Sequence, residues 1–148
     1  MRAHGVDAVY PGLGSALSIA CMSQNSEIAA YCISHGADVH ARDADGGTPL
    51  VDACTFSDFE TVRLLVEAGA EINAANKYDK RPIAKAIAHH PRNYEPIEYL
   101  IEHGADPFVE ERYRSDDPRR TTYTAYDYAE QEIGDQKLVA LLDRYRKA

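Results

Sequence analysis

Three apolar segments of the chain share a helical spacing, and each is followed at the same distance by a glycine. The segments are 29–33, 62–66 and 97–101, and the glycines are Gly36, Gly69 and Gly104. Acidic side chains such as Glu60 and Glu67 lie opposite the apolar stripe of the second segment, as on the solvated face of an amphipathic helix. Glycine readily takes the left-handed conformation that ends a helix. The pattern predicts three helices, each of which ends at its glycine.

Two short motifs recur with the same period. Gly36-Ala37-Asp38 returns as Gly69-Ala70-Glu71 and again as Gly104-Ala105-Asp106, which are intervals of 33 and 35 residues. Thr48-Pro49-Leu50 is matched by Arg81-Pro82-Ile83, and the two prolines are also 33 positions apart, from 49 to 82. Proline fits the first position of a helix, where its missing N–H is not needed, and Thr48 would then be the N-cap. The period therefore predicts repeated helix-turn-helix units.

With these motifs the chain resembles the ankyrin repeat, a unit of about 33 residues with a β-turn, two helices and the signature T-P-L-H-x-A. Residues 41–73 follow the pattern closely and residues 74–108 more loosely. The resemblance implies an all-α fold, an ankyrin-repeat solenoid of stacked helix-turn-helix units with β-turn tips. We expect a single domain over residues 1–148, with repeats at about 13–40, 41–73, 74–108 and 122–148 and an inserted loop at about 109–123.

The chain departs from the family pattern at the motif histidine. That position is held by Ser18, Val51, Ala84 and Asp127. The hydrogen-bond chain that this histidine forms between repeats is therefore absent, and we expect apolar packing to contribute more of the stability. Leu50, Ala53 and Cys54 should point into the stack. The inserted loop should map to one face of the array, which in solenoids is often the binding face.

The resemblance also implies a protein partner on the concave side, which is built from the β-turn tips and the exposed face of each first helix. The inserted loop would add arginine and tyrosine, which interfaces favour. The residues that we expect to bind the partner are Arg42, Asp45, Asp52, Phe56, Lys77, Tyr78, Lys80, Lys85, His89, Arg112, Tyr113 and Arg114. Simpler interpretations stay open: a cross-repeat ion pair for Asp52 and Lys85, isolated surface aromatics for Phe56 and Tyr78, and a loop without a task.

Composition narrows the function classes. The net charge of −8 argues against a general nucleic-acid binder and would suit a basic partner. No apolar run reaches the length of a membrane helix, and we expect no signal peptide. The cysteines Cys21, Cys32 and Cys54 lack the close pairing of a zinc site, so we expect buried thiols in a reducing, cytoplasmic protein. The tyrosines Tyr123, Tyr126 and Tyr128 are expected to cap the last repeat.

Catalytic chemistry finds little support in the sequence. The six histidines are scattered, and His35 and His103 precede helix-ending glycines, where they would satisfy terminal carbonyls. His89 and His90 are adjacent and so do not face the same way on a helix. We predict no catalytic residue, no metal and no cofactor. The expected function is a non-enzymatic protein-protein interaction module, monomeric when unbound, that binds one partner. The alternatives are an immunity- or inhibitor-type protein that covers the active site of a toxin or enzyme, and an enzyme with an unrecognised site.

Overall fold

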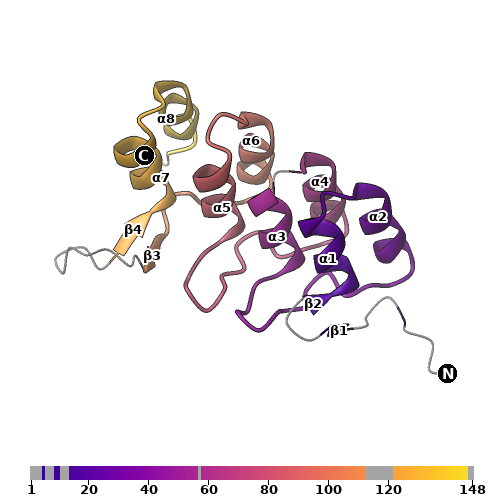
Figure 1. Cartoon of the computed structure of the whole chain (residues 1–148). Helices are drawn as coiled ribbons and strands as arrows, with labels where there is room; N and C mark the ends of the chain where they lie inside the picture. Colours follow the sequence, from indigo (N-terminus) through magenta and orange to yellow (C-terminus); the bar gives the residue numbers. More distant parts are fainter. Residues whose placement is uncertain (1–4, 6–8, 11–13, 57, 113–121, 147–148) are drawn as a thin grey trace.

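The helices stand in pairs, and the pairs follow one another in chain order (Figure 1). A computed structural model describes residues 5, 9–10, 14–56, 58–112 and 122–146. The pairs are α1 (Ala16–Met22) with α2 (Ser26–Ser34), α3 (Pro49–Phe56) with α4 (Phe59–Glu67), α5 (Pro82–His89) with α6 (Tyr94–Glu102), and α7 (Ala125–Tyr128) with α8 (Gln136–Asp143). A π-helical turn, η1 (Ala129–Ile133), extends α7. The predicted all-α solenoid of helix-turn-helix units is confirmed.

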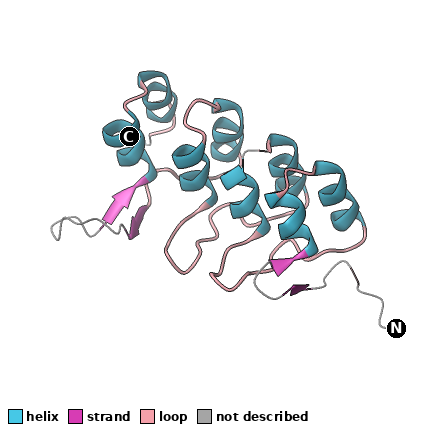
Figure 2. Ribbon diagram, in the orientation of Figure 1, coloured by secondary structure: helices cyan, strands magenta, loops and turns pink. Residues whose placement is uncertain are grey.

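The first helices of the pairs pack against one another, and so do the second helices. Helix α3 lies between α1 and α5, α5 also contacts α7, and α4 lies between α2 and α6. The loops between the pairs project to one side of the stack (Figure 2). We call the loop over 41–48 the second tip and the loop over 74–81 the third tip. None of the helices in the described part of the chain is long and apolar enough to cross a membrane.

The helix ends follow from local chemistry. Helices α3 and α5 begin at Pro49 and Pro82, as predicted. The Thr48 hydroxyl accepts a hydrogen bond from the backbone N–H of Val51 at 3.4 Å, in the manner of an N-cap. The three glycines that follow the second helices adopt positive φ angles, which are +86° at Gly36, +91° at Gly69 and +102° at Gly104. A side chain would strain the backbone there, so these positions require glycine.

The two histidines that precede helix-ending glycines satisfy carbonyl groups, as predicted. His35 donates from Nδ1 to the carbonyl oxygen of Tyr31 at 2.8 Å, and His103 donates to that of Tyr99 at 2.7 Å. The His35 ring stacks on the Tyr31 ring, with centroids 3.9 Å apart, and the His103 ring lies tilted against the Tyr99 ring, with centroids 4.1 Å apart. These histidines therefore complete helix ends.

The core is built from the same repeat position in successive helices. Leu17, Leu50 and Ile83 are spaced 33 residues apart and are fully buried. Ala53 and Cys54 are also buried, as predicted, and so are Cys21 and Cys32. These aliphatic side chains and thiols run through the stack from one pair to the next. Apolar contact between neighbours therefore holds the pairs together, as expected of a solenoid.

Two short hairpins accompany the helices. Strand β1 (Val9–Tyr10) pairs with β2 (Gly14–Ser15), and β3 (Glu110–Arg112) pairs in antiparallel register with β4 (Thr122–Thr124). The expected inserted loop at 109–123 thus has strands at its two ends, which the sequence analysis did not predict. The reason is a two-residue alternation: Glu111 and Tyr123 lie opposite each other and are buried, whereas Glu110 and Thr122 are exposed. We call the strand pair β3–β4 the hairpin.

Candidate protein-binding surface

Contacts between the second and third tips engage several of the predicted binding residues. The backbone N–H of Lys77 donates to the carbonyl oxygen of Asp45 at 2.9 Å, and the two side chains form an ion pair. Arg42 donates from Nη1 to the carbonyl oxygens of Gly46 and Ala75, both at 2.8 Å. The side chains of Asp45 and Lys77 are about half exposed. They brace the tips and still face solvent, so a binding role for them stays a prediction.

Exposed aromatic side chains lie on α3 and on the third tip. Phe56, at the end of α3, is 38% exposed, and Tyr78, on the third tip, is 50% exposed. The Lys77 ammonium lies 5.1 Å from the centroid of the Tyr78 ring, at cation–π distance. Large aromatics of this kind are the residues that dominate binding energy at interfaces. Both rings can therefore contribute contact area to a partner.

The hairpin is attached to the third tip through a buried carboxylate. Glu111 is 4% exposed and accepts hydrogen bonds from the Lys80 ammonium and from the Arg81 backbone N–H, both at 3.3 Å. Lys80 also donates to the carbonyl oxygen of Arg112 at 3.2 Å, and the Arg112 side chain forms an ion pair with Asp79. Burial raises the pKa of the Glu111 carboxyl above its ordinary value, and the cations only partly offset this. Lys80 and Arg112, which we expected to bind a partner, thus hold the hairpin in place.

A pocket of about 170 Å³ opens between α5, the hairpin and α7. We call it the hairpin pocket. Its lining includes Ala84, Lys85, Ala88 and His89 from α5, with Lys80 and Glu111 at one wall. Tyr123 and Thr124 from the hairpin and Ala125 and Tyr128 from α7 complete the lining. The structure therefore brings together three of the predicted binding residues, Lys80, Lys85 and His89.

Neither the hairpin nor α7 is predicted from the sequence to contribute to this pocket. Tyr123, Tyr126 and Tyr128 are expected to cap the last repeat, and Tyr126 does pack as a cap, being 6% exposed with its hydroxyl 3.0 Å from Asp143 Oδ1. Tyr123 and Tyr128 instead line the hairpin pocket. The signal that could have found the strand is the Thr-Tyr-Thr run at 122–124, which is β-branched and aromatic. Tyr113 and Arg114 lie outside the described residues.

Asp52 and Lys85 lie next to each other on neighbouring helices, as their spacing predicted. Burial raises the pKa of the Asp52 carboxyl to about 7, although a hydrogen bond with the Ser18 side chain and the charge of Lys85 act to lower it. Asp43 raises it further. Among the described residues, no ion pair within 4 Å links Asp52 to Lys85. The alternative of a plain cross-repeat ion pair is therefore not observed.

The adjacent histidines His89 and His90 have separate environments. His90 donates from Nε2 to the carbonyl oxygen of Thr55 at 2.8 Å and so links α5 to the end of α3. Burial, followed by the charges of Lys85 and His90, lowers the pKa of His89. In the described part of the chain, no three His, Cys, Asp or Glu side chains gather into a group that could hold a metal ion. His90 thus joins two neighbouring helices, whereas His89 lines the hairpin pocket.

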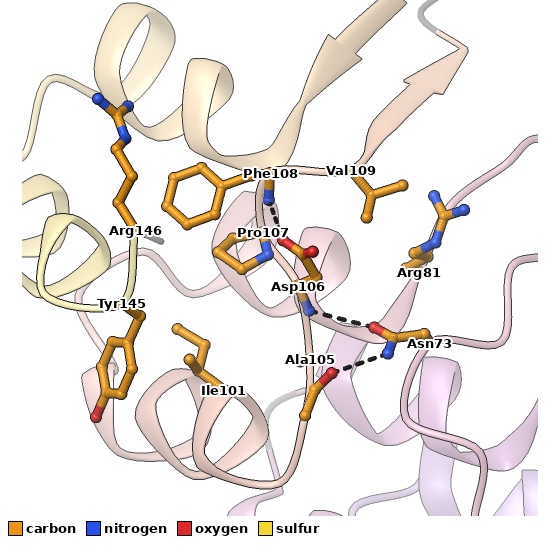
Figure 3. A pocket seen from close by; sticks show the side chains of 11 residues that line it. Asn73, Arg81, Ile101, Ala105, Asp106, Pro107, Phe108, Val109, Tyr145 and Arg146 are labelled. Carbon is orange, nitrogen blue, oxygen red and sulfur yellow. Dashed lines mark hydrogen bonds between the residues drawn. The ribbon is translucent and has the colours of Figure 1, made fainter. Parts of the chain in front are cut away.

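A larger hollow, of about 770 Å³, lies where the third repeat meets the C-terminal end of the described chain. Figure 3 shows Phe108 and Ile101 in its middle, Arg146 and Tyr145 at one side, and Asn73 at the other. The Asn73 amide donates to the carbonyl oxygen of Gly104 at 2.9 Å and accepts from the Asp106 N–H at 3.3 Å, so its polar atoms are already used within the chain (Figure 3). None of the predicted binding residues lines this hollow.

Comparisons with known proteins identify similar chains. A family model described as ankyrin repeats, in three copies, matches residues 5–76. Protein phosphatase 1 regulatory subunit 27 of Mus musculus is 37% identical over 75 residues, which cover 51% of this chain and 49% of the relative. Ankyrin repeat and SOCS box protein 5 of Mus musculus is 38% identical over 102 residues, covering 69% of this chain and 30% of the relative. This chain therefore spans half or less of the length of these relatives.

Proposed function

The chain belongs to the ankyrin-repeat family, whose repeats form protein-interaction modules, and we propose that it binds one partner protein and catalyses no reaction. We further propose that the partner lies across the exposed side of α3 and α5, the second and third tips, and the hairpin pocket. The observation that carries this placement is that Lys80, Lys85 and His89, each expected at a binding position, line one pocket. Phe56 and Tyr78 add exposed aromatic surface.

The names of the relatives support a binding role. One relative is a regulatory subunit of a phosphatase, and such a subunit acts by contacting another protein. Nothing in the described residues or in the relatives' names favours the immunity- or inhibitor-type alternative. Three free, buried cysteines support a further proposal, that the protein works in a reducing compartment such as the cytoplasm.

The test is affinity capture from the native cells, read by mass spectrometry, with the full chain and two double variants as bait. Phe56→Ala with Tyr78→Ala removes the aromatics of the proposed surface. Ile28→Ala with Tyr31→Ala is the matched control, because these side chains are 51% and 58% exposed on α2, away from that surface. We expect the first variant to weaken binding at least tenfold, as hot-spot truncations do, and the control to bind like the unaltered chain.

Each captured partner is then titrated against all three baits, and thermal unfolding checks that both variants fold. A partner lost only by the Ile28 and Tyr31 variant would move the binding surface to α2 and overturn the proposed placement. Turnover of a captured protein or metabolite by the purified chain would overturn the non-enzymatic role.

A further inference from the structure

We propose that the hairpin pocket receives one acidic side chain, glutamate or aspartate, of the partner protein. This inference rests on the proposed function, because it names the chemistry of the partner at that surface. It concerns a place where the local charge is the reverse of the net charge of the chain. Three features carry it: the charge balance of the walls, the size and lining of the pocket, and the hairpin that closes it.

The charge left over at the pocket is positive. Glu111 is the carboxylate of the wall, and it is already engaged by Lys80 and Arg81. Lys85 contrasts with it, because among the described residues its ammonium makes no hydrogen bond and no ion pair within 4 Å. Asp52 acts on Lys85 through space but does not form an ion pair with it. A half-buried lysine that makes no hydrogen bond or close ion pair binds an anion more strongly than one in bulk water does, because the local dielectric constant is lower.

The pocket has the size and lining for one side chain with an apolar stem. Its volume of about 170 Å³ is too small for a helix or a nucleotide. The methyl groups of Ala84, Ala88 and Ala125 and the rings of Tyr123 and Tyr128 can pack against methylene groups. His89, at the rim, has a lowered pKa and is therefore neutral at pH 7, so its ring N–H can donate to a carboxylate without adding charge.

A carboxylate fits the cation better than a phosphate does. Phosphorylated side chains are bound by clusters of arginine, whose planar forks make paired hydrogen bonds. The pocket offers two lysines, of which Lys80 is already paired with Glu111, and the remaining Lys85 acts as a point charge. The Arg81 guanidinium lies beside Glu111, with Nη1 3.7 Å from Oε1. One carboxylate therefore balances the charge of the pocket.

The preference for an acidic side chain is confined to the last junction of the array, where the hairpin meets the third tip. At the equivalent position of α3, 33 residues before Lys85, the side chain is Asp52. The hairpin supplies Glu111, Tyr123 and Thr124 to the pocket wall, and the first two of these residues come from the inserted segment. An acidic group of the partner should therefore be directed to α5 and α7 and away from α3.

The experiment selects short random peptides, displayed on phage, for binding to the full chain. We expect the selected peptides to share a glutamate or aspartate. Replacing that residue by glutamine or asparagine should weaken binding to the unaltered chain about tenfold, as expected for a charge-assisted hydrogen bond. The same replacement should have no effect on binding to the Lys85→Gln variant, because this variant lacks the ammonium charge that the peptide carboxylate contacts.

A pair of steric variants checks the location. Ala88→Leu fills the pocket and should weaken the peptides at least tenfold, whereas Ala140→Leu makes the same change at an exposed position of α8 and should leave binding unchanged. The proposal is overturned if the replacement of the acidic residue weakens binding to the unaltered chain and to the Lys85→Gln variant equally. It is also overturned if Ala88→Leu leaves peptide binding unchanged. If peptides that contradict the proposal in this way still bind more weakly to the Phe56 and Tyr78 variant, the proposed binding surface stands although the pocket does not bind an acidic side chain. Peptides indifferent to all of these variants overturn both proposals.

Discussion

The junction between the second and third tips differs sharply from the junction between the third tip and the hairpin. At the first, Asp45 and Lys77 pair while about half of each side chain remains in solvent. At the second, Glu111 is 4% exposed and is held by Lys80 and Arg81. Both junctions join segments about one repeat apart. The regular repeat leaves the ion pair between its tips in solvent, whereas the inserted hairpin buries the carboxylate of the last junction and creates a pocket.

The physical difference between the two junctions is the amount of hydration that the charged groups lose when they pair. Exposed ion pairs contribute about 0–1 kcal/mol, because water screens both charges and the side chains lose entropy on pairing. A buried carboxylate has given up its hydration, so its partners must remain in place.

Glu111→Ala should lower the free energy of unfolding by about 2–3 kcal/mol, because it leaves Lys80 and Arg81 at a closed junction without their carboxylate. Asp45→Ala, the matched change at the open junction, should lower it by less than about 1 kcal/mol. Urea unfolding followed by circular dichroism measures both. Similar losses at the two junctions would mean that burial of the carboxylate does not distinguish them.

Asp52→Asn should reveal the strain of a carboxylate at the α3–α5 junction. Burial raises the pKa of Asp52 to about 7, from an ordinary value of about 3.9. The folded state therefore binds more protons between these values, and its stability falls as the pH rises from about 4 to about 7. Asparagine removes this loss, so the variant should be more stable than the unaltered chain by about 1–2 kcal/mol above pH 7, allowing for partial solvent exposure.

The measurement is urea unfolding of both chains between about pH 4 and pH 8. The difference in stability should shrink toward pH 4, where the carboxyl group is protonated in the folded state. A constant difference across this range would show that Asp52 does not titrate there.

His90→Ala should lower the free energy of unfolding by about 1 kcal/mol, because it removes the hydrogen bond to the Thr55 carbonyl oxygen that links α5 to α3. His89→Ala is the adjacent control and should change stability by less than about 0.5 kcal/mol, since its ring is exposed at the pocket. Thermal unfolding of the two variants at pH 8 gives the comparison. An equal shift for both would assign the effect to helix propensity and not to the cross-repeat bond.

Local chemistry made the regular part of this protein predictable from its sequence. Pro49 and Pro82 begin helices because their fixed φ suits a first helical turn, and Gly36 follows a helix end because it tolerates positive φ. The 33-residue period also placed Leu17 above Leu50 in the core, since equal positions of stacked units become neighbours. These results depend on residues close in sequence or on one repeated spacing.

The hairpin pocket could not be predicted in this way. It depends on the pairing of strands on either side of residues 113–121 and on a buried carboxylate that accepts hydrogen bonds from Lys80 and Arg81, about thirty positions earlier in the chain. The period did predict that Asp52 and Lys85 are neighbours, but only the side-chain geometry decided that they form no ion pair. The helices, their order and the apolar stack can be inferred from the sequence, because they follow from short-range preferences and repetition. Tertiary structure alone decided which charges are buried together and where the surface is hollowed, because burial is a property of segments distant in the chain.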